Sequence, residues 1–77
     1  MMNKEELFRF VKENQLEQCF YYNDYGTDPL DVMLYRNDDG TFSAFVNGYE
    51  RGYRDQVRNV SEYEACNFCQ DWLKVGR

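Results

Sequence analysis

The sequence contains no histidine, and this absence excludes several kinds of site. Without an imidazole ring the chain can form neither a Ser-His-Asp nor a Cys-His catalytic arrangement, and no histidine can bind a metal. Basic residues are also few: 9 Lys and Arg stand against 14 Asp and Glu, which gives a net charge of −5. Proteins that bind nucleic acid or anionic membranes carry the opposite excess. We therefore expect a protein that is not an enzyme, uses no metal or other cofactor, and binds neither nucleic acid nor membranes.

Long apolar runs are missing as well. The opening residues, Met1–Leu7, contain two glutamates and a lysine, which argues against a signal peptide, and no stretch reaches the length of a membrane span. We expect a cytoplasmic protein, in which the 3 cysteines remain free thiols because that compartment is reducing. The length of 77 residues permits one domain, which we assign to residues 1–77.

The excess of acidic residues has two interpretations. An acidic protein suits a basic partner, because complementary electric fields speed the encounter of two proteins. Alternatively, the charge only keeps the protein in solution. Aromatic residues make up 18% of the chain, so some rings are expected at the surface. The 7 tyrosines fit a protein-binding surface, where tyrosine is enriched, but strands favour tyrosine too.

The first part of the chain is predicted to be a helix followed by a strand. Residues 3–17 have apolar residues at helical spacing, and Asn3 with Glu6 resembles a capping box in which Asn replaces Ser or Thr. Residues 18–23 are rich in aromatic side chains and are predicted to form a short strand. Residues 24–29 combine Gly, Asp and Pro, which is typical of a loop.

The last part of the chain, residues 61–75, is also predicted to be a helix. Ser61 and Glu64 form a capping box at its start, and Gly76 is predicted as its C-cap. Its stripe of buried residues is expected to face the hairpin described next and comprises Ala65, Phe68, Cys69, Trp72 and Leu73.

Residues 30–36 and 41–47 are predicted to form a β-hairpin. The connector, residues 37–40, reads Asn-Asp-Asp-Gly, which fits a type I turn with Gly at the left-handed position. This turn sets a register in which Leu34 faces Ala44. The aliphatic face, expected to meet the helices, then carries Val32, Leu34, Ala44 and Val46. The opposite face, expected to be only partly covered, carries Met33, Tyr35, Ser43 and Phe45.

A weaker pattern over residues 53–58 predicts a polar edge strand, with Arg54 and Arg58 protecting the edge from pairing with other chains. The element order is therefore α-β-β-β-(β)-α. We predict an α+β fold of two layers, an antiparallel sheet of three to four strands with both helices packed on one face.

The motif Cys66-Asn67-Phe68-Cys69 has the spacing of redox and zinc sites. A redox pair usually lies at a helix N-terminus, whereas Cys66 lies more than a turn inside the predicted helix. A zinc site needs a fourth ligand, and Cys19 would supply only a third thiolate. We therefore interpret these cysteines as structural, with a metal or redox role as the alternative.

Aspartates gather in the middle of the chain, but their spacing does not fit a calcium-binding loop. One interpretation is that they form turns on a solvated rim, and the other is that they form an acidic interface. The residues concerned are Asp24, Asp28, Asp31, Asp38 and Asp39.

Four parts of the sequence together resemble the immunity protein fifty-nine family, whose members are small bacterial proteins linked to polymorphic toxin systems. The resemblance covers nearly the whole chain. It implies a cytoplasmic antidote that binds and neutralises a cognate toxin, and it carries over no catalytic residues. The matching parts are Asn3–Leu7, Tyr22–Pro29, Glu50–Gly52, and Ser61–Ala65 leading into Trp72 and Leu73.

The partner is predicted to bind the sheet face that the helices leave uncovered. Tyr35 and Phe45 are expected to be the anchors of an aromatic centre, and carboxylates at its rim would steer a toxin with a basic surface. The alternative is that a second copy of the chain covers this face and forms a homodimer. The predicted partner-binding residues are Asp24, Tyr25, Asp28, Met33, Tyr35, Asp38, Asp39 and Phe45.

Two further functions remain open at the level of sequence. The chain could be an acidic regulatory protein, such as a nucleic-acid mimic or a small subunit of a larger complex. A small thiol-dependent enzyme using Cys66 and Cys69 is the least favoured.

Overall fold

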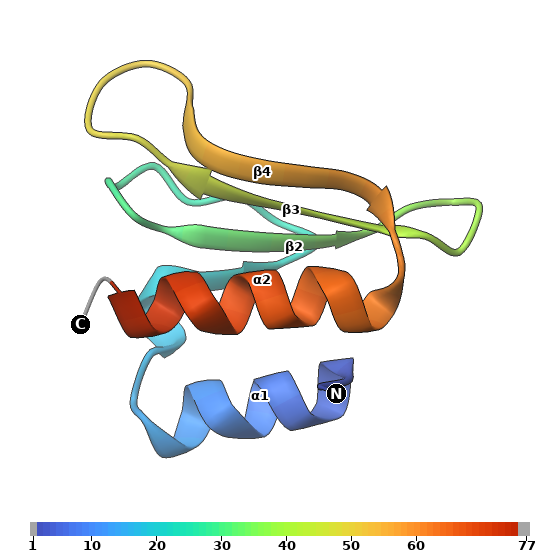
Figure 1. Cartoon of the computed structure of the whole chain (residues 1–77). Helices are drawn as coiled ribbons and strands as arrows, with labels where there is room; N and C mark the ends of the chain where they lie inside the picture. The colour runs from blue at the N-terminus through green and yellow to red at the C-terminus, as the bar shows by residue number, and fades with distance from the viewer. Residues whose placement is uncertain (1, 76–77) are drawn as a thin grey trace.

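The computed structural model describes residues 2–75, and its first helix begins where the sequence predicts (Figure 1). Helix α1 spans Lys4–Glu13. The Asn3 side chain accepts a hydrogen bond from the Glu6 N–H at 2.8 Å, and the Glu6 side chain accepts one from the Asn3 N–H at 2.9 Å. This confirms the predicted capping box. The helix ends earlier than predicted because Gln15 adopts a φ of 56°, which an α-helix cannot contain.

The second helix, α2, spans Glu62–Val75. Ser61 Oγ accepts a hydrogen bond from the Glu64 N–H at 3.1 Å, so Ser61 caps this helix as predicted. The first residue of α2 also holds α1, because Glu62 Oε2 accepts a hydrogen bond from the Lys4 N–H at 2.8 Å. The predicted C-cap, Gly76, lies outside the described residues.

The strands form one mixed sheet in the order β1-β2-β3-β4. The predicted α+β class is confirmed, but the prediction of a wholly antiparallel sheet is wrong, because β1 runs parallel to β2. The strand β1 is short, so the connection over residues 23–31 can return the chain to the same end of the sheet before β2 begins. The bounds are Phe20–Tyr22 for β1, Val32–Arg36 for β2, Phe42–Asn47 for β3 and Tyr53–Val60 for β4.

The hairpin of β2 and β3 has the predicted register. Leu34 pairs with Ala44, and the Asn37 N–H donates to the Thr41 carbonyl oxygen at 2.8 Å beside the turn. The edge strand β4 also exists and is longer than predicted. It pairs with β3 through two irregularities, which break the flat edge that another chain would pair with.

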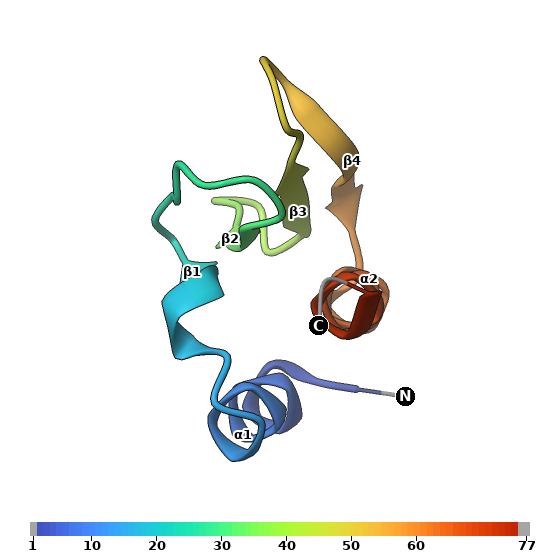
Figure 2. The ribbon, with the colours of Figure 1, turned by 90° about the vertical axis from the view of Figure 1, so that its left-hand side faces the viewer.

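The aliphatic face of the hairpin meets both helices in one core cluster. Figure 2 shows α2 on one side of the sheet, α1 next to α2 on the β1 side, and the connection from β1 to β2 on the side away from α2. The buried members of the cluster are Leu7, Val11, Leu16, Cys19, Val32, Leu34, Phe42, Ala44, Val46, Ala65, Cys66, Cys69 and Leu73. Among residues 2–75, no helix is long and apolar enough to cross a membrane.

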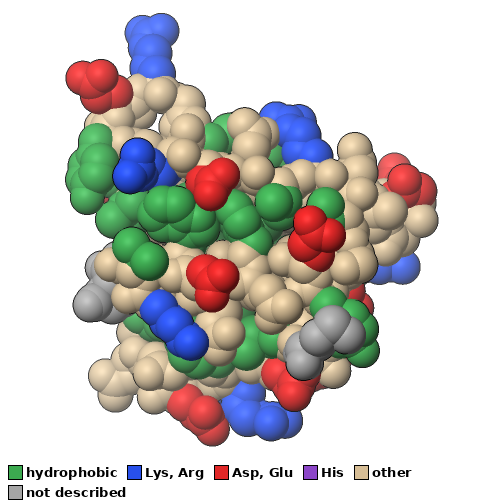
Figure 3. All heavy atoms as spheres, viewed as in Figure 1, with side chains coloured by type: hydrophobic (Ala, Val, Ile, Leu, Met, Phe, Trp, Pro, Cys, Tyr) green, Lys and Arg blue, Asp and Glu red, His purple; other side chains and the backbone are tan. Residues whose placement is uncertain are grey.

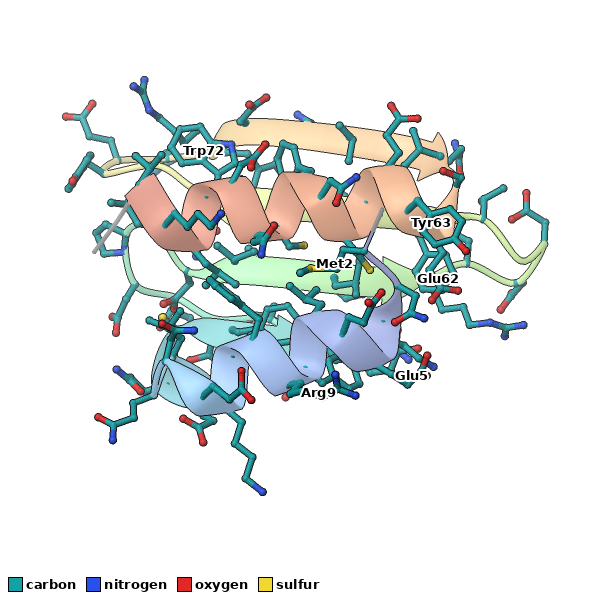
Figure 4. All side chains as sticks on the ribbon, turned by 60° about the horizontal axis from the view of Figure 1, so that its bottom comes forward. Met2, Glu5, Arg9, Glu62, Tyr63 and Trp72 are labelled. Carbon is teal, nitrogen blue, oxygen red and sulfur yellow. The ribbon has the colours of Figure 1, made fainter. Side chains whose placement is uncertain are left out.

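Trp72 and Phe68 pack against the core cluster but are only partly buried, so they are less buried than the sequence predicts. Trp72 lies on the β4 side of α2, where its Nε1 donates to Asp55 Oδ2 at 3.2 Å (Figure 4). The buried residues of α2 are instead Ala65, Cys66, Cys69 and Leu73, most of which have small side chains. A band of hydrophobic side chains consequently reaches the surface between α2 and β4 (Figure 3).

Candidate protein-binding surface

The sheet has an open face, which points away from the helices. Side chains alternate along a strand, so the hairpin residues that lie between the aliphatic ones in sequence point to this side. The neighbouring strands extend it, because Tyr21 pairs with Met33 and Gln56 pairs with Phe45. We define the open face by its residues Tyr21, Met33, Tyr35, Ser43, Phe45, Tyr53 and Gln56.

An aromatic row of Tyr35, Phe45 and Tyr53 crosses three strands of the open face. The ring centroids of Tyr35 and Phe45 are 5.7 Å apart in an edge-to-face arrangement, and those of Phe45 and Tyr53 are 4.7 Å apart. Both separations lie in the range where rings attract one another. The row is therefore a packed and pre-formed surface, which loses little side-chain entropy when a partner binds.

Phe45 lies beneath the other side chains of the row and is 9% exposed. The Arg58 guanidinium lies over its ring, with Cζ 5.0 Å from the centroid, and Arg58 Nε donates to Gln56 Oε1 at 2.6 Å. Tyr53 in contrast is 49% exposed. Phe45 thus supports the surface and offers little contact area for the anchor role that the sequence predicts for it.

Met33 is 2% exposed, so its prediction as a partner contact is wrong. It pairs with Tyr21, and the connection between β1 and β2 lies on this side of the sheet (Figure 2). That connection packs closely, because a Cβ added at Gly26 would collide with the Tyr21 ring and with Asp31 Oδ2. The β1 side of the open face is therefore covered by the chain itself.

Hydrogen bonds fix both ends of the segment Asp24-Tyr25. On one side, the Asn23 N–H donates to the Leu34 carbonyl oxygen at 2.8 Å, and Asn23 Oδ1 accepts from the Arg36 N–H at 3.0 Å. This places Asp24 beside the β2 residues that flank Tyr35.

On the other side, Asn47 at the end of β3 holds the same segment. Its Nδ2 donates to the carbonyl oxygens of Gly26 at 2.8 Å and Asp28 at 3.1 Å. Asn47 pairs with Tyr53, so the segment is tied to β2 next to Tyr35 at one end and to β3 opposite Tyr53 at the other. Asn47 was missed at the level of sequence, where Asn before Gly indicates only a turn.

Asp31 has a structural role in this connection. It is 3% exposed, and its Oδ2 accepts a hydrogen bond from the Asp28 N–H at 3.0 Å. Its charge is the main reason that the pKa of the Tyr21 hydroxyl is raised, with Asp28 and Asp24 adding smaller contributions. Asp31 therefore belongs to neither the solvated rim nor the accessible part of an interface.

The electrostatic surroundings of Tyr35 are negative. Burial raises the pKa of its hydroxyl most, and Tyr53, Asp24 and Tyr25 raise it further. No basic group among residues 2–75 lowers it. These contributions agree with the hydrogen bonds of Asn23 and Asn47, which hold the segment Asp24-Tyr25 at this end of the open face.

The predicted acidic rim is divided between two ends of the open face. Asp24 and Asp28 lie in the connection over residues 23–31, whereas Asp38 and Asp39 lie at the hairpin turn. Asp39 is engaged there, because its Oδ1 accepts from the Thr41 Oγ1–H at 2.6 Å and from the Thr41 N–H at 3.0 Å. These bonds lower the pKa of Asp39.

Basic residues interrupt the rim at the hairpin end. Asp38 lines a shallow depression of about 420 Å³ together with Arg36 and Arg58. The predicted rim carboxylates are therefore in different surroundings: those near Tyr25 lie at an acidic end, and those of the hairpin turn lie at an end of mixed charge.

The cysteine pair lies in the core. Cys66 and Cys69 are each 0% exposed, and burial raises the pKa of Cys66 to about 12 and that of Cys69 beyond it. A thiol of this kind stays protonated at neutral pH and is not a nucleophile there. Within residues 2–75, no group of three or more Cys, Asp and Glu side chains is arranged to hold a metal ion.

No family model matches the chain, and neither a curated protein nor a solved structure is similar enough to count as a match. The family resemblance in the sequence therefore stays a prediction.

Proposed function

We propose that the chain is an immunity protein that binds a cognate bacterial toxin domain and blocks it. The observation that carries this proposal is the aromatic row on the open face, backed by a four-stranded sheet and flanked by the exposed Tyr25. Packed tyrosines at a surface are typical of the centre of a protein interface. The net charge of −5 adds long-range attraction toward a basic partner.

The proposed contact residues differ from those expected at the outset. Tyr35 and Tyr53 provide the contact area, and Phe45 with Arg58 holds their arrangement. Asp24 and Tyr25 extend the surface at one end, and Asp28 lies in the same connection. Once these side chains bind the toxin, the chain covers part of the toxin surface and thereby blocks its activity.

The experiment first looks for a toxin-domain gene beside the gene of this chain, and then measures the growth of a host that expresses that neighbouring toxin. The wild-type chain should restore growth, and Tyr35→Ala and Tyr53→Ala should each bind the toxin about 30-fold more weakly, as interface anchors do. Tyr63→Ala is a matched control, because Tyr63 is 43% exposed but lies on α2.

Circular dichroism and urea unfolding must show that every variant is folded before growth is compared. Toxin binding is then measured with purified proteins. Folded Tyr35→Ala and Tyr53→Ala proteins that protect as well as the wild type would remove the aromatic row from the proposal. A wild-type chain that fails to protect against the neighbouring toxin would contradict immunity itself.

A further inference from the structure

One carboxylate at the acidic end of the open face has no basic partner among residues 2–75. Asp24 Oδ1 accepts a hydrogen bond from the Tyr25 N–H at 2.8 Å, and its side chain is exposed. Among residues 2–75 the one ion pair joins Lys4 Nζ to Glu5 Oε2 at 3.9 Å. The charge of Asp24 is therefore available to a cation from another molecule.

Elsewhere the chain places its own cations on its aromatic rings. Arg58 lies 5.0 Å from the Phe45 centroid, and Arg54 lies 5.8 Å from that of Trp72. In the described part of the chain, no such cation lies over Tyr25, Tyr35 or Tyr53, which we call the tyrosine cluster. These rings are therefore available to a cation on the sides that do not pack against Phe45, and the Asp24 carboxylate lies in the segment held at the same end of the row.

The surface next to Tyr53 has room for a side chain and favours a positive one. A hollow of about 450 Å³ lies between the connection over residues 23–31 and the turn before β4, and Tyr53 forms part of its wall. Glu50 is its one charged lining residue. The depression at the other end of the open face contains Arg36 and Arg58, which would repel a cation.

We propose that the tyrosine cluster, with Asp24 as counter-ion, is the binding site for an arginine side chain of the partner protein. Arginine fits better than lysine, because its planar guanidinium stacks on rings and donates two parallel hydrogen bonds to a carboxylate. The proposal rests on the proposed function, since it names the group on the toxin that the aromatic row receives. The proposed site also sets the orientation of the partner, because the partner's arginine would lie at the Tyr25 end of the aromatic row.

The test needs no toxin. Purified isotope-labelled protein is titrated with N-acetyl-arginine amide and, separately, with N-acetyl-citrulline amide, which has the same shape without the charge. The arginine probe should shift the ring resonances of the tyrosine cluster and bind about tenfold more tightly than the citrulline probe, because only the cation attracts both rings and carboxylate. Asp24→Asn should weaken arginine binding about threefold, as expected for an exposed ion pair.

Asp39→Asn is the matched control, because Asp39 lies at the hairpin turn and its carboxylate is bound to Thr41. It should leave binding of the arginine probe unchanged. Four outcomes would each overturn the proposal. They are equal binding of the two probes, resonance shifts centred on Asp38, an Asp24→Asn variant that binds the arginine probe like the wild type, and the absence of a saturable shift.

A second copy of the chain is the competing occupant of the tyrosine cluster. Sedimentation that shows a stable dimer dissociated by Tyr53→Ala would overturn the arginine site. If the titration fails while the wild-type chain still protects cells from the toxin, immunity stands and the arginine site is wrong. If the titration succeeds while protection fails, the immunity proposal is wrong.

Discussion

The two faces of one sheet differ in what their side chains do. On the helix-covered face, Val32, Leu34, Ala44 and Val46 are each 0% exposed and pack in the core. On the open face, the same two strands carry Tyr35 and Phe45, whose rings pack together, and Tyr53 of β4 packs on Phe45 from the other side. Residues next to each other in sequence thus serve stability and binding separately, because alternate side chains of a strand point to opposite sides. A substitution in the aromatic row can therefore change binding without opening the core.

The largest expected effect tests this separation directly. Leu34→Ala should lower the free energy of unfolding by about 3–4 kcal/mol, because it leaves a cavity in the core. Tyr35→Ala, one residue away on the other face, should cost about 1 kcal/mol. Urea unfolding of both variants measures the difference. Equal losses would mean that the open face is part of the core and unsuited to independent binding.

The next effect concerns the buried thiols of α2, which lie in the core on the helix-covered side of the sheet. The pKa of Cys66 is raised to about 12 in the folded chain, whereas an unfolded cysteine titrates near about 8.5. Below the unfolded pKa, the protonated thiol contributes fully to the free energy of unfolding. This contribution is lost as the pH rises from the unfolded pKa toward the folded pKa. By pH 10 the loss from Cys66 should reach about 2 kcal/mol.

Unfolding free energies measured in reductant from pH 7.5 to pH 10 check this prediction. The Cys66→Ala variant removes one titrating group and should show a shallower decline than the wild type. Parallel pH profiles for the two proteins would show that this thiol is already accessible to water in the folded state.

A glycine tests how the open face is partly covered. Gly26→Ala should destabilise the fold by about 2 kcal/mol, because the new methyl group meets Asp31 and the Tyr21 ring. Gly48→Ala is the matched control: the nearest atom to its new Cβ lies at 3.4 Å, so its effect should stay within about 0.5 kcal/mol. Thermal unfolding of both proteins makes the comparison, and a stable Gly26→Ala protein would mean that the connection shifts easily.

The smallest effect is expected at Trp72, which lies at the edge of the core between α2 and β4. Trp72→Phe keeps a ring beside β4 but removes the hydrogen bond to Asp55, so it should cost about 1 kcal/mol or less. A loss of several kcal/mol in chemical unfolding would place Trp72 in the core, as the sequence pattern suggested.

Sequence patterns correctly predicted the features that depend only on residues close together in the chain, namely the helix caps and the hairpin turn. Asn3 and Ser61 cap the helices as predicted, and the turn at residues 37–40 sets the observed hairpin register. For the candidate surface, the register correctly placed Tyr35 and Phe45 on one face. The exposure of Phe45 was predicted wrongly, because Arg58 and Tyr53 reach it from a different strand.

The sequence by itself determined the class of the fold, the N-caps of both helices and the face to which each hairpin residue points, because these follow from local backbone preferences and the alternation of a strand. Tertiary structure alone decided that β1 runs parallel to β2, that the connecting segment buries Met33, and that Asn47 holds Asp24 and Tyr25 beside the aromatic row. Each of these depends on contacts between residues far apart in the chain. Such contacts are selected by how the whole molecule packs, and no local spacing encodes them.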